Sequence, residues 1–185
     1  MKSALIVIDV QQSFMHRPYW TEAGVPAFRQ RVQSLIDRFH AAGQPVLQVF
    51  HVDSTDASDP FSLASGHIST LPGVNVEPTD TFQKAVHSAM FGVNGAGQTL
   101  DDWLREQGIE QLVITGIRTE QCCETTTRHA SDLGYSVTYA IDATLTFPMV
   151  AESGRIFSAE EIAERTQLVL AGRFAKVVKA DAVRP

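Results

Sequence analysis

Two adjacent cysteines, Cys122 and Cys123, are the residues best placed for covalent chemistry in this chain. They follow the apolar run 111–115, which predicts a buried strand, and they open a segment that predicts a helix ending near Leu133. Ligands of open α/β sheets bind beside the carboxyl ends of the strands. The amino end of a helix favours negative charge there, and hence a thiolate over a thiol. Either cysteine is therefore a candidate nucleophile, which leaves the rest of the chain to supply a base and a cation.

Two further predicted strand ends carry such groups. Asp9 follows the continuous apolar run 4–8, and Lys84 ends a short strand predicted over 81–84. A free thiol has a pKa of about 8.5, so it needs a base to accept its proton and a cation to stabilise the thiolate. Each residue also has a structural interpretation: a strand-end aspartate, a surface lysine, or a cysteine that acts as a small buried hydrophobe.

The elements that would position these groups follow from the hydrophobic pattern. Strands are expected at 4–8, 46–52, 81–84, 111–115, 136–141 and 175–178. Four helices are expected. The first runs from Val25 past Phe39 and ends before Gly43, and the second begins after an N-cap at Thr99. The third begins at the cysteines, and the fourth begins after a capping box formed by Ser158 and Glu161. Strands that alternate with helices imply a three-layer α/β/α domain with a Rossmann-like, six-stranded, mostly parallel sheet. The length of 185 residues predicts one domain over 1–185.

Composition narrows the classes of function. Hydrophobic residues make up 44% of the chain and the formal net charge is −6, which indicates a globular protein without a basic surface for nucleic acid. The first apolar run is too short to span a membrane and lacks the layout of a signal peptide, so a cytoplasmic protein without membrane partners is expected. Neighbouring cysteines rarely bridge each other, which agrees with a reducing compartment.

Three segments, taken in order, resemble the isochorismatase-like cysteine hydrolases, a superfamily that includes nicotinamidase and N-carbamoylsarcosine amidase. Residues 9–14 (DVQQSF) resemble its D-x-Q-x-x-F, and residues 84–90 (KAVHSAM) resemble its K-x-x-x-S-A-F. Residues 116–123 (GIRTEQCC) resemble its G-x-x-T-x-x-C-V. The resemblance extends over nearly the whole chain and implies the isochorismatase-like hydrolase fold.

The resemblance also implies roles for individual residues. Cys122 would be the nucleophile, Asp9 the general base and Lys84 the third catalytic residue, whereas Cys123 takes a packing position. It implies a cis peptide between Ile117 and Arg118, and an oxyanion hole made by the backbone N–H groups of Arg118 and Cys122. The activity expected is hydrolysis of a C–N bond in a small amide, carbamoyl or ureido compound, with no cofactor.

Substrate contacts are expected from the long polar loop 53–79 and from a group of mostly aromatic side chains: Phe14, Trp20, Met90 and Phe91. Trp20 and Phe91 could equally be core residues. The Arg118 side chain differs from the small residues that are common at this position in the superfamily. We expect it either to contact the substrate or a neighbouring subunit, or to be solvated.

No metal is expected. Nicotinamidases of the superfamily carry an Asp-x-His metal motif near the second strand, whereas this chain has the reverse order, His51-Val52-Asp53, with His67 far along the loop. The sequence of residues 92–99 resembles the pattern of a phosphate-binding loop, but it has Gln98 at the position where that motif needs lysine. The resemblance implies a homo-oligomer, a dimer or tetramer. Two alternative functions are an isochorismatase-type vinyl-ether hydrolase that uses Asp9 without the cysteine, and a non-catalytic binding protein on the same fold.

Overall fold

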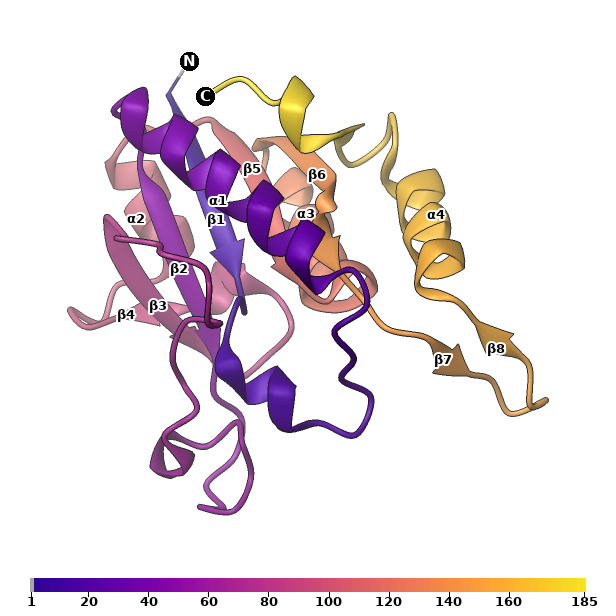
Figure 1. Cartoon of the computed structure of the whole chain (residues 1–185). Helices are drawn as coiled ribbons and strands as arrows, with labels where there is room; N and C mark the ends of the chain where they lie inside the picture. Colours follow the sequence, from indigo (N-terminus) through magenta and orange to yellow (C-terminus); the bar gives the residue numbers. More distant parts are fainter. Residues whose placement is uncertain (1) are drawn as a thin grey trace.

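The computed structural model describes residues 2–185, which form a central sheet with helices on both faces (Figure 1). The sheet has seven strands in the order β4-β3-β2-β1-β5-β6-β9, and every neighbouring pair is parallel except β3 and β4. The strands are β1 (Ser3–Ile8), β2 (Val46–His51), β3 (Asp80–Lys84), β4 (Val93–Asn94), β5 (Gln111–Ile117), β6 (Ser136–Leu145) and β9 (Lys176–Val178). The three-layer, mostly parallel fold is thus confirmed, with one strand more than the six predicted.

The additional strand β4 is only two residues long and runs antiparallel to β3. A second short pair, β7 (Met149–Val150) and β8 (Ile156–Phe157), forms a separate antiparallel hairpin that projects from the body of the molecule (Figure 1). Two residues are too few to show a hydrophobic period, so neither feature was predicted from the sequence.

Four α-helices within the described residues cover the sheet: α1 (Val25–Ala41), α2 (Leu100–Glu106), α3 (Glu124–Asp132) and α4 (Ala159–Leu170). Helix α1 covers one face, and its buried stripe has the predicted spacing of Val25, Phe28, Val32, Leu35, Ile36 and Phe39. The predicted capping box of α4 is present, with the Ser158 side chain accepting from the Glu161 N–H and the Glu161 side chain accepting from the Ser158 N–H.

Two hydrophobic clusters lie on opposite faces of the sheet, and strand β1 contributes to both. Leu5 and Val7 belong to the cluster under α1, whereas Ala4, Ile6 and Ile8 belong to the cluster that also holds Leu100, Leu104 and Ala130 of α2 and α3. These five residues of β1 have no solvent exposure. This explains why the run is continuously apolar, since a parallel strand is covered on both faces. No helix within residues 2–185 is long and apolar enough to cross a membrane.

Candidate active site

Four adjacent strands end at one edge of the sheet and carry reactive side chains there. The order β3-β2-β1-β5 brings Lys84 and His51, the last residues of β3 and β2, beside Asp9, which directly follows β1. Cys122 lies in a single π-helical turn (Thr119–Cys123) between β5 and α3. π-Helical turns within helices are frequent at functional sites. Residues up to 113 positions apart in sequence are thus collected by the strand order.

The Lys84 ammonium is the centre of this group. Its Nζ lies 2.8 Å from Oδ2 of Asp9, 3.4 Å from Sγ of Cys122 and 2.7 Å from Nδ1 of His51. The Lys84 and Asp9 side chains are both completely shielded from solvent. An ammonium has three N–H donors and no acceptor, so these three partners satisfy it fully. The structure therefore brings together the three residues predicted to be catalytic and adds a fourth.

Asp9 has one carboxylate oxygen committed to Lys84 and one that is not. Within residues 2–185, Oδ1 of Asp9 is buried and has no hydrogen-bond partner. Carboxylate and sulfur ligand atoms of Asp9 and Cys122 lie within 4.8 Å of each other. Asp9 also has a φ of 52°, a left-handed conformation that is costly for a non-glycine residue and clusters at functional sites. Oδ1 of Asp9 therefore has an unused capacity to accept a proton or a hydrogen bond inside the site.

The electrostatics of Cys122 differ from the sequence-based expectation of a favoured thiolate. Burial and the nearby Asp9 carboxylate raise the pKa of the Cys122 thiol, and the Lys84 ammonium offsets only part of this effect. Lys84 stays protonated: burial lowers its pKa, but Asp9 and Cys122 more than compensate, so the net pKa is raised. The resting site is thus a carboxylate, an ammonium and a neutral thiol, whose charges sum to zero.

Cys122, rather than Cys123, faces the cavity at this site. Cys122 is 6% exposed and lines the cavity beside Asp9. Cys123 is fully buried in the core cluster under α2 and α3, and burial raises the pKa of its thiol well above the ordinary value. This geometry separates the two cysteines, which the local sequence left equivalent.

The backbone before Cys122 forms a tight turn. The peptide between Ile117 and Arg118 is cis, as the resemblance implied. The Arg118 carbonyl accepts hydrogen bonds from the N–H groups of Gln121 (3.2 Å) and Cys123 (3.3 Å). This turn carries the two backbone N–H groups, of Arg118 and Cys122, that were predicted to stabilise an oxyanion, and that role remains a prediction.

A cavity of about 140 Å³ opens above the cysteine. Its lining combines three aromatic rings with polar and charged groups: Asp9, Phe14, Arg17, Tyr19, His51, Asp53, Phe61, His87, Gln121 and Cys122. This volume is below the roughly 300–1,000 Å³ of pockets for drug-sized ligands, so the site suits a small substrate.

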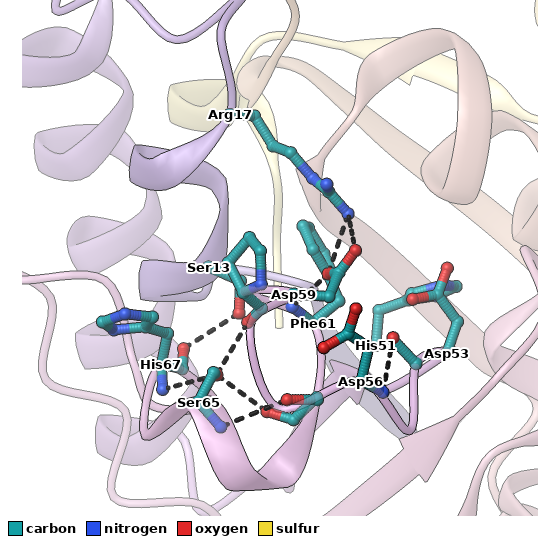
Figure 2. Close-up of polar contacts among 12 residues, drawn as sticks. Ser13, Arg17, His51, Asp53, Asp56, Asp59, Phe61, Ser65 and His67 are labelled. Atoms are coloured by element: carbon teal, nitrogen blue, oxygen red, sulfur yellow. Dashed lines mark hydrogen bonds and ion pairs between the residues drawn. The ribbon is translucent and has the colours of Figure 1, made fainter.

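The long loop after β2 forms one wall of the cavity and is tied down by polar contacts (Figure 2). Arg17 donates to both carboxylate oxygens of Asp59, at 3.1 and 3.3 Å, and its guanidinium lies 4.7 Å from the centre of the Phe61 ring. Phe61 in turn packs edge-on against Phe14, with ring centres 5.0 Å apart. Farther along, the Ser13 hydroxyl donates to the His67 carbonyl at 2.9 Å. These contacts connect the loop to the segment that follows Asp9.

The structure places the predicted substrate contacts at different depths. Phe14 lines the cavity, as predicted. Met90 is 2% exposed within the core, whereas Phe91 is 60% exposed and lies against His129. Trp20 packs on Phe147 and donates to Glu22 at 2.9 Å. Met90, Phe91 and Trp20 are therefore not among the described residues that line the cavity, because their side chains point into the core or away from the site.

Arg118 is held by its own neighbours. Its side chain is 8% exposed, lies 2.9 Å from the Glu120 carboxylate and stacks over the Tyr19 and Phe147 rings at 4.9 and 5.7 Å. It is therefore neither solvated nor part of the described cavity lining; it supports Tyr19, which does line the cavity.

Sequence reasoning missed several residues of the cavity lining. His87 and Gln121 belong to it but occupy variable positions of the motif segments 84–90 and 116–123, whereas Arg17, Tyr19 and Phe61 carry no periodic or motif signal. Gln121 could have been found from its position directly before the cysteine. The others come from loops whose paths are fixed by tertiary contacts.

Of the residues considered for a metal, His51 and Asp53 contact each other at 3.0 Å. The His67 ring stacks on His16, with ring centres 3.7 Å apart. Asp9, His51 and Cys122 are the group of described residues with metal-type ligand atoms close together. All three contact the Lys84 ammonium, which thus acts as the cation at their centre.

Comparisons with known proteins identify the family of this chain. The sequence model of the isochorismatase domain matches residues 3–177. An uncharacterized isochorismatase family protein of Bacillus subtilis strain 168 is 27% identical over 97% of this chain and 93% of its own length. Nicotinamidase 3 of Arabidopsis thaliana is 28% identical over 98% of this chain and 87% of its own. Among solved structures, a putative hydrolase of the isochorismatase family from Chromobacterium violaceum superposes on this chain with a TM-score of 0.85. The two sequences are 28% identical, and the match covers 97% of this chain and 90% of that protein. The chain therefore belongs to the isochorismatase domain family of hydrolases.

Proposed function

We propose that this protein is a cysteine hydrolase that cleaves a C–N bond of a small amide, carbamoyl or ureido compound. The observation that supports this most directly is the contact of one buried ammonium, Lys84, with both the Asp9 carboxylate and the Cys122 sulfur at the base of a small cavity. The likeness to a nicotinamidase supports an amide rather than an ether as substrate.

The first half of the reaction transfers one proton and exchanges one bond. Asp9 takes the proton of the Cys122 thiol as the sulfur attacks the substrate carbonyl carbon, and the carbonyl oxygen becomes an oxyanion held by backbone N–H groups of Arg118 and Cys122. Protonated Asp9 then gives the proton to the departing nitrogen as the C–N bond breaks. The products of this half are a free amine or ammonia and a thioester on Cys122.

The second half returns the site to its resting state. Asp9, ionised again, takes a proton from water as that water attacks the thioester carbonyl. The C–S bond breaks, the carboxylic acid product leaves, and Asp9 returns its proton to the sulfur.

The charges of the triad explain why a thiol with a raised pKa is compatible with this reaction. Moving the proton from Cys122 to Asp9 converts a carboxylate and a thiol into an acid and a thiolate, while Lys84 stays positive. The sum of the three charges is zero before and after the transfer. The buried site therefore never holds an uncompensated charge, which would be costly at this depth.

The test is ammonia release from a panel of small primary amides, N-carbamoyl and ureido compounds, measured for wild type, Cys122→Ala and Cys123→Ala. Loss of the nucleophile should lower kcat by at least about 1,000-fold, whereas the Cys123 variant, which changes a buried packing residue outside the cavity, should retain turnover. Full activity in Cys122→Ala would overturn the proposal and favour a hydrolysis by Asp9 without a covalent intermediate, such as that of a vinyl ether.

A further inference from the structure

His51 is a buried, ionisable residue that the proposed reaction does not use. It is the last residue of β2, and the strand register pairs it directly with Lys84, the last residue of β3. Directly paired residues of neighbouring strands project to the same face of a sheet, so the two side chains lie together. The contact they make, 2.7 Å between Nδ1 of His51 and Nζ of Lys84, is the shortest of the three that the ammonium forms.

The contact fixes the form of the imidazole ring. Lys84 can only donate, so Nδ1 of His51 must accept, and the ring proton then lies on Nε2. Nε2 is 3.0 Å from Oδ2 of Asp53, which accepts that proton's hydrogen bond. Asp53 therefore holds the ring in the tautomer that binds Lys84.

The backbone of His51 is held on both sides by one buried side chain. The Gln11 amide accepts from the His51 N–H at 2.7 Å and donates to the His51 carbonyl at 3.0 Å. Gln11 has no solvent exposure and follows Asp9 by two residues. The segment that carries the base is thus tied to the strand that carries the imidazole.

We propose that His51 is a positioning residue for catalysis: it occupies the third N–H of Lys84, so that the other two are directed at Asp9 and Cys122. Without this acceptor, the third N–H would have to donate to water or to the Asp9 carboxylate. The ammonium would then rotate, and its contact with the Cys122 sulfur would be lost. An ammonium on a four-carbon chain has rotational freedom that its partners must restrict. This inference rests on the proposed function for its kinetic consequences, but its geometry does not depend on the substrate.

The charged and titratable groups that face His51 all belong to this arrangement. Lys84 and Asp53 contact the ring directly, Asp9 and Cys122 have ligand atoms within 4.8 Å of it, and the His87 ring centre is 6.4 Å away. Phe61 covers the ring edge-on, at 5.8 Å between centres. The ring is thus largely surrounded by these groups, although it also lines the cavity, and its Nδ1 acceptor contacts the ammonium.

The substitutions that test this role differ in whether they keep an acceptor at the Nδ1 position. The amide of Asn can place an oxygen close to that of Nδ1, whereas Gln places its amide near Nε2 and Leu has no acceptor. We expect His51→Leu and His51→Gln to lower kcat by about 100-fold with KM changed less than about threefold, and His51→Asn to stay within about fivefold of wild type. His40→Leu, on the exposed end of α1, is the matched control for loss of a histidine.

A second readout is independent of any substrate. Alkylation of Cys122 by iodoacetamide, followed by peptide mass spectrometry as a function of pH, reports how well Lys84 stabilises the thiolate. The Leu and Gln variants should require a higher pH for the same rate, because the ammonium is no longer directed at sulfur, and the Asn variant should follow wild type. Thermal unfolding of each variant confirms that it is folded.

The possible results separate this inference from the proposed function. Equal kcat and equal alkylation profiles in wild type and a folded His51→Leu or His51→Gln would overturn the role of His51, as would an Asn variant as impaired as both. If Cys122→Ala retained full turnover, the proposed reaction would fail, yet the alkylation profiles would still decide whether His51 directs Lys84.

Discussion

Asp9 and Lys84 form an ion pair of 2.8 Å in which neither side chain has any exposure to solvent. A buried pair is weak evidence for stability, since the cost of removing both charges from water offsets their attraction. In the proposed reaction its value is electrostatic preorganisation, because Lys84 also contacts the sulfur that would carry a negative charge. We therefore assign the pair to the proposed reaction site, and we expect its removal to change the pKa of the thiol.

Replacing Asp9 by Asn should separate the reactivity of the thiol from turnover. The Asp9 carboxylate raises the pKa of Cys122, second only to burial, so its neutralisation should lower that pKa and speed alkylation by iodoacetamide at pH 8 several-fold. Turnover should fall by about 100- to 10,000-fold, because the proposed general base is removed. Asp37→Asn, on the exposed face of α1, serves as the control. Slower alkylation in Asp9→Asn would contradict this account of the electrostatics.

Replacing Asp59 by Ala should weaken substrate binding more than the chemical step. Asp59 binds Arg17 through both carboxylate oxygens, and its Oδ1 also accepts from the Phe61 N–H at 2.8 Å. Loss of these contacts loosens the cavity wall without touching the triad. We expect KM to rise by about fivefold or more, equivalent to roughly 1 kcal/mol, with kcat changed less. Steady-state kinetics on the best compound of the panel would measure this, and a selective loss of kcat would contradict it.

Gly116 should not tolerate a side chain. It pairs with Ile8 in the β1–β5 register, has a φ of 137°, and a Cβ there would lie 1.9 Å from the Ile8 carbonyl oxygen. Because that oxygen belongs to the backbone of a central strand, it cannot move aside. Gly116→Ala should therefore cost more than about 4 kcal/mol or prevent folding, as seen by urea unfolding or soluble yield. Gly134→Ala offers a comparison: it also has a positive φ, 95°, but its Cβ would meet nothing within 4 Å.

Alkaline pH should destabilise the fold through its buried thiols. Burial raises the pKa values of Cys122 and Cys123 in the folded protein. An unfolded thiol has a pKa of about 8.5, so at any pH between that value and the folded pKa values the native state binds more protons than the unfolded state. The free energy of unfolding must then fall as pH rises, by up to about 1.4 kcal/mol per pH unit for each thiol, while the full contribution is present below pH 8.

The measurement is urea unfolding with a reductant at several pH values from 7 to 10. Cys123→Ala removes one of the two thiols, so its free energy of unfolding should decline less steeply than that of wild type. Parallel curves for the two proteins would show that Cys123 titrates normally in the folded state.

The sequence by itself predicted the architecture and three of the side chains that meet at the candidate site. The run 4–8 is continuously apolar because β1 is buried on both faces, and this local composition is enough to predict a parallel sheet between helices. Asp9, Lys84 and Cys122 lie at strand ends, and strand ends of parallel sheets meet at one edge whatever the details of packing. The capping box of α4 is likewise local, since its two residues satisfy each other's backbone N–H groups.

The tertiary structure decided how the groups are combined and what surrounds them. His51 joins the site because the β2–β3 register places it against Lys84, and no local pattern encodes a register between strands separated by a long loop. Cys122 and Cys123 became distinguishable only when a π-helical turn directed one toward the cavity and the other into the core. Met90 and Phe91 have similar sequence environments but opposite burial, because the direction of a side chain in a short turn is set by what packs against it. The raised pKa of Cys122 is also a tertiary effect, because it comes from burial and from the Asp9 carboxylate, 113 residues away in sequence. An argument from the helix terminus alone includes neither of these two causes.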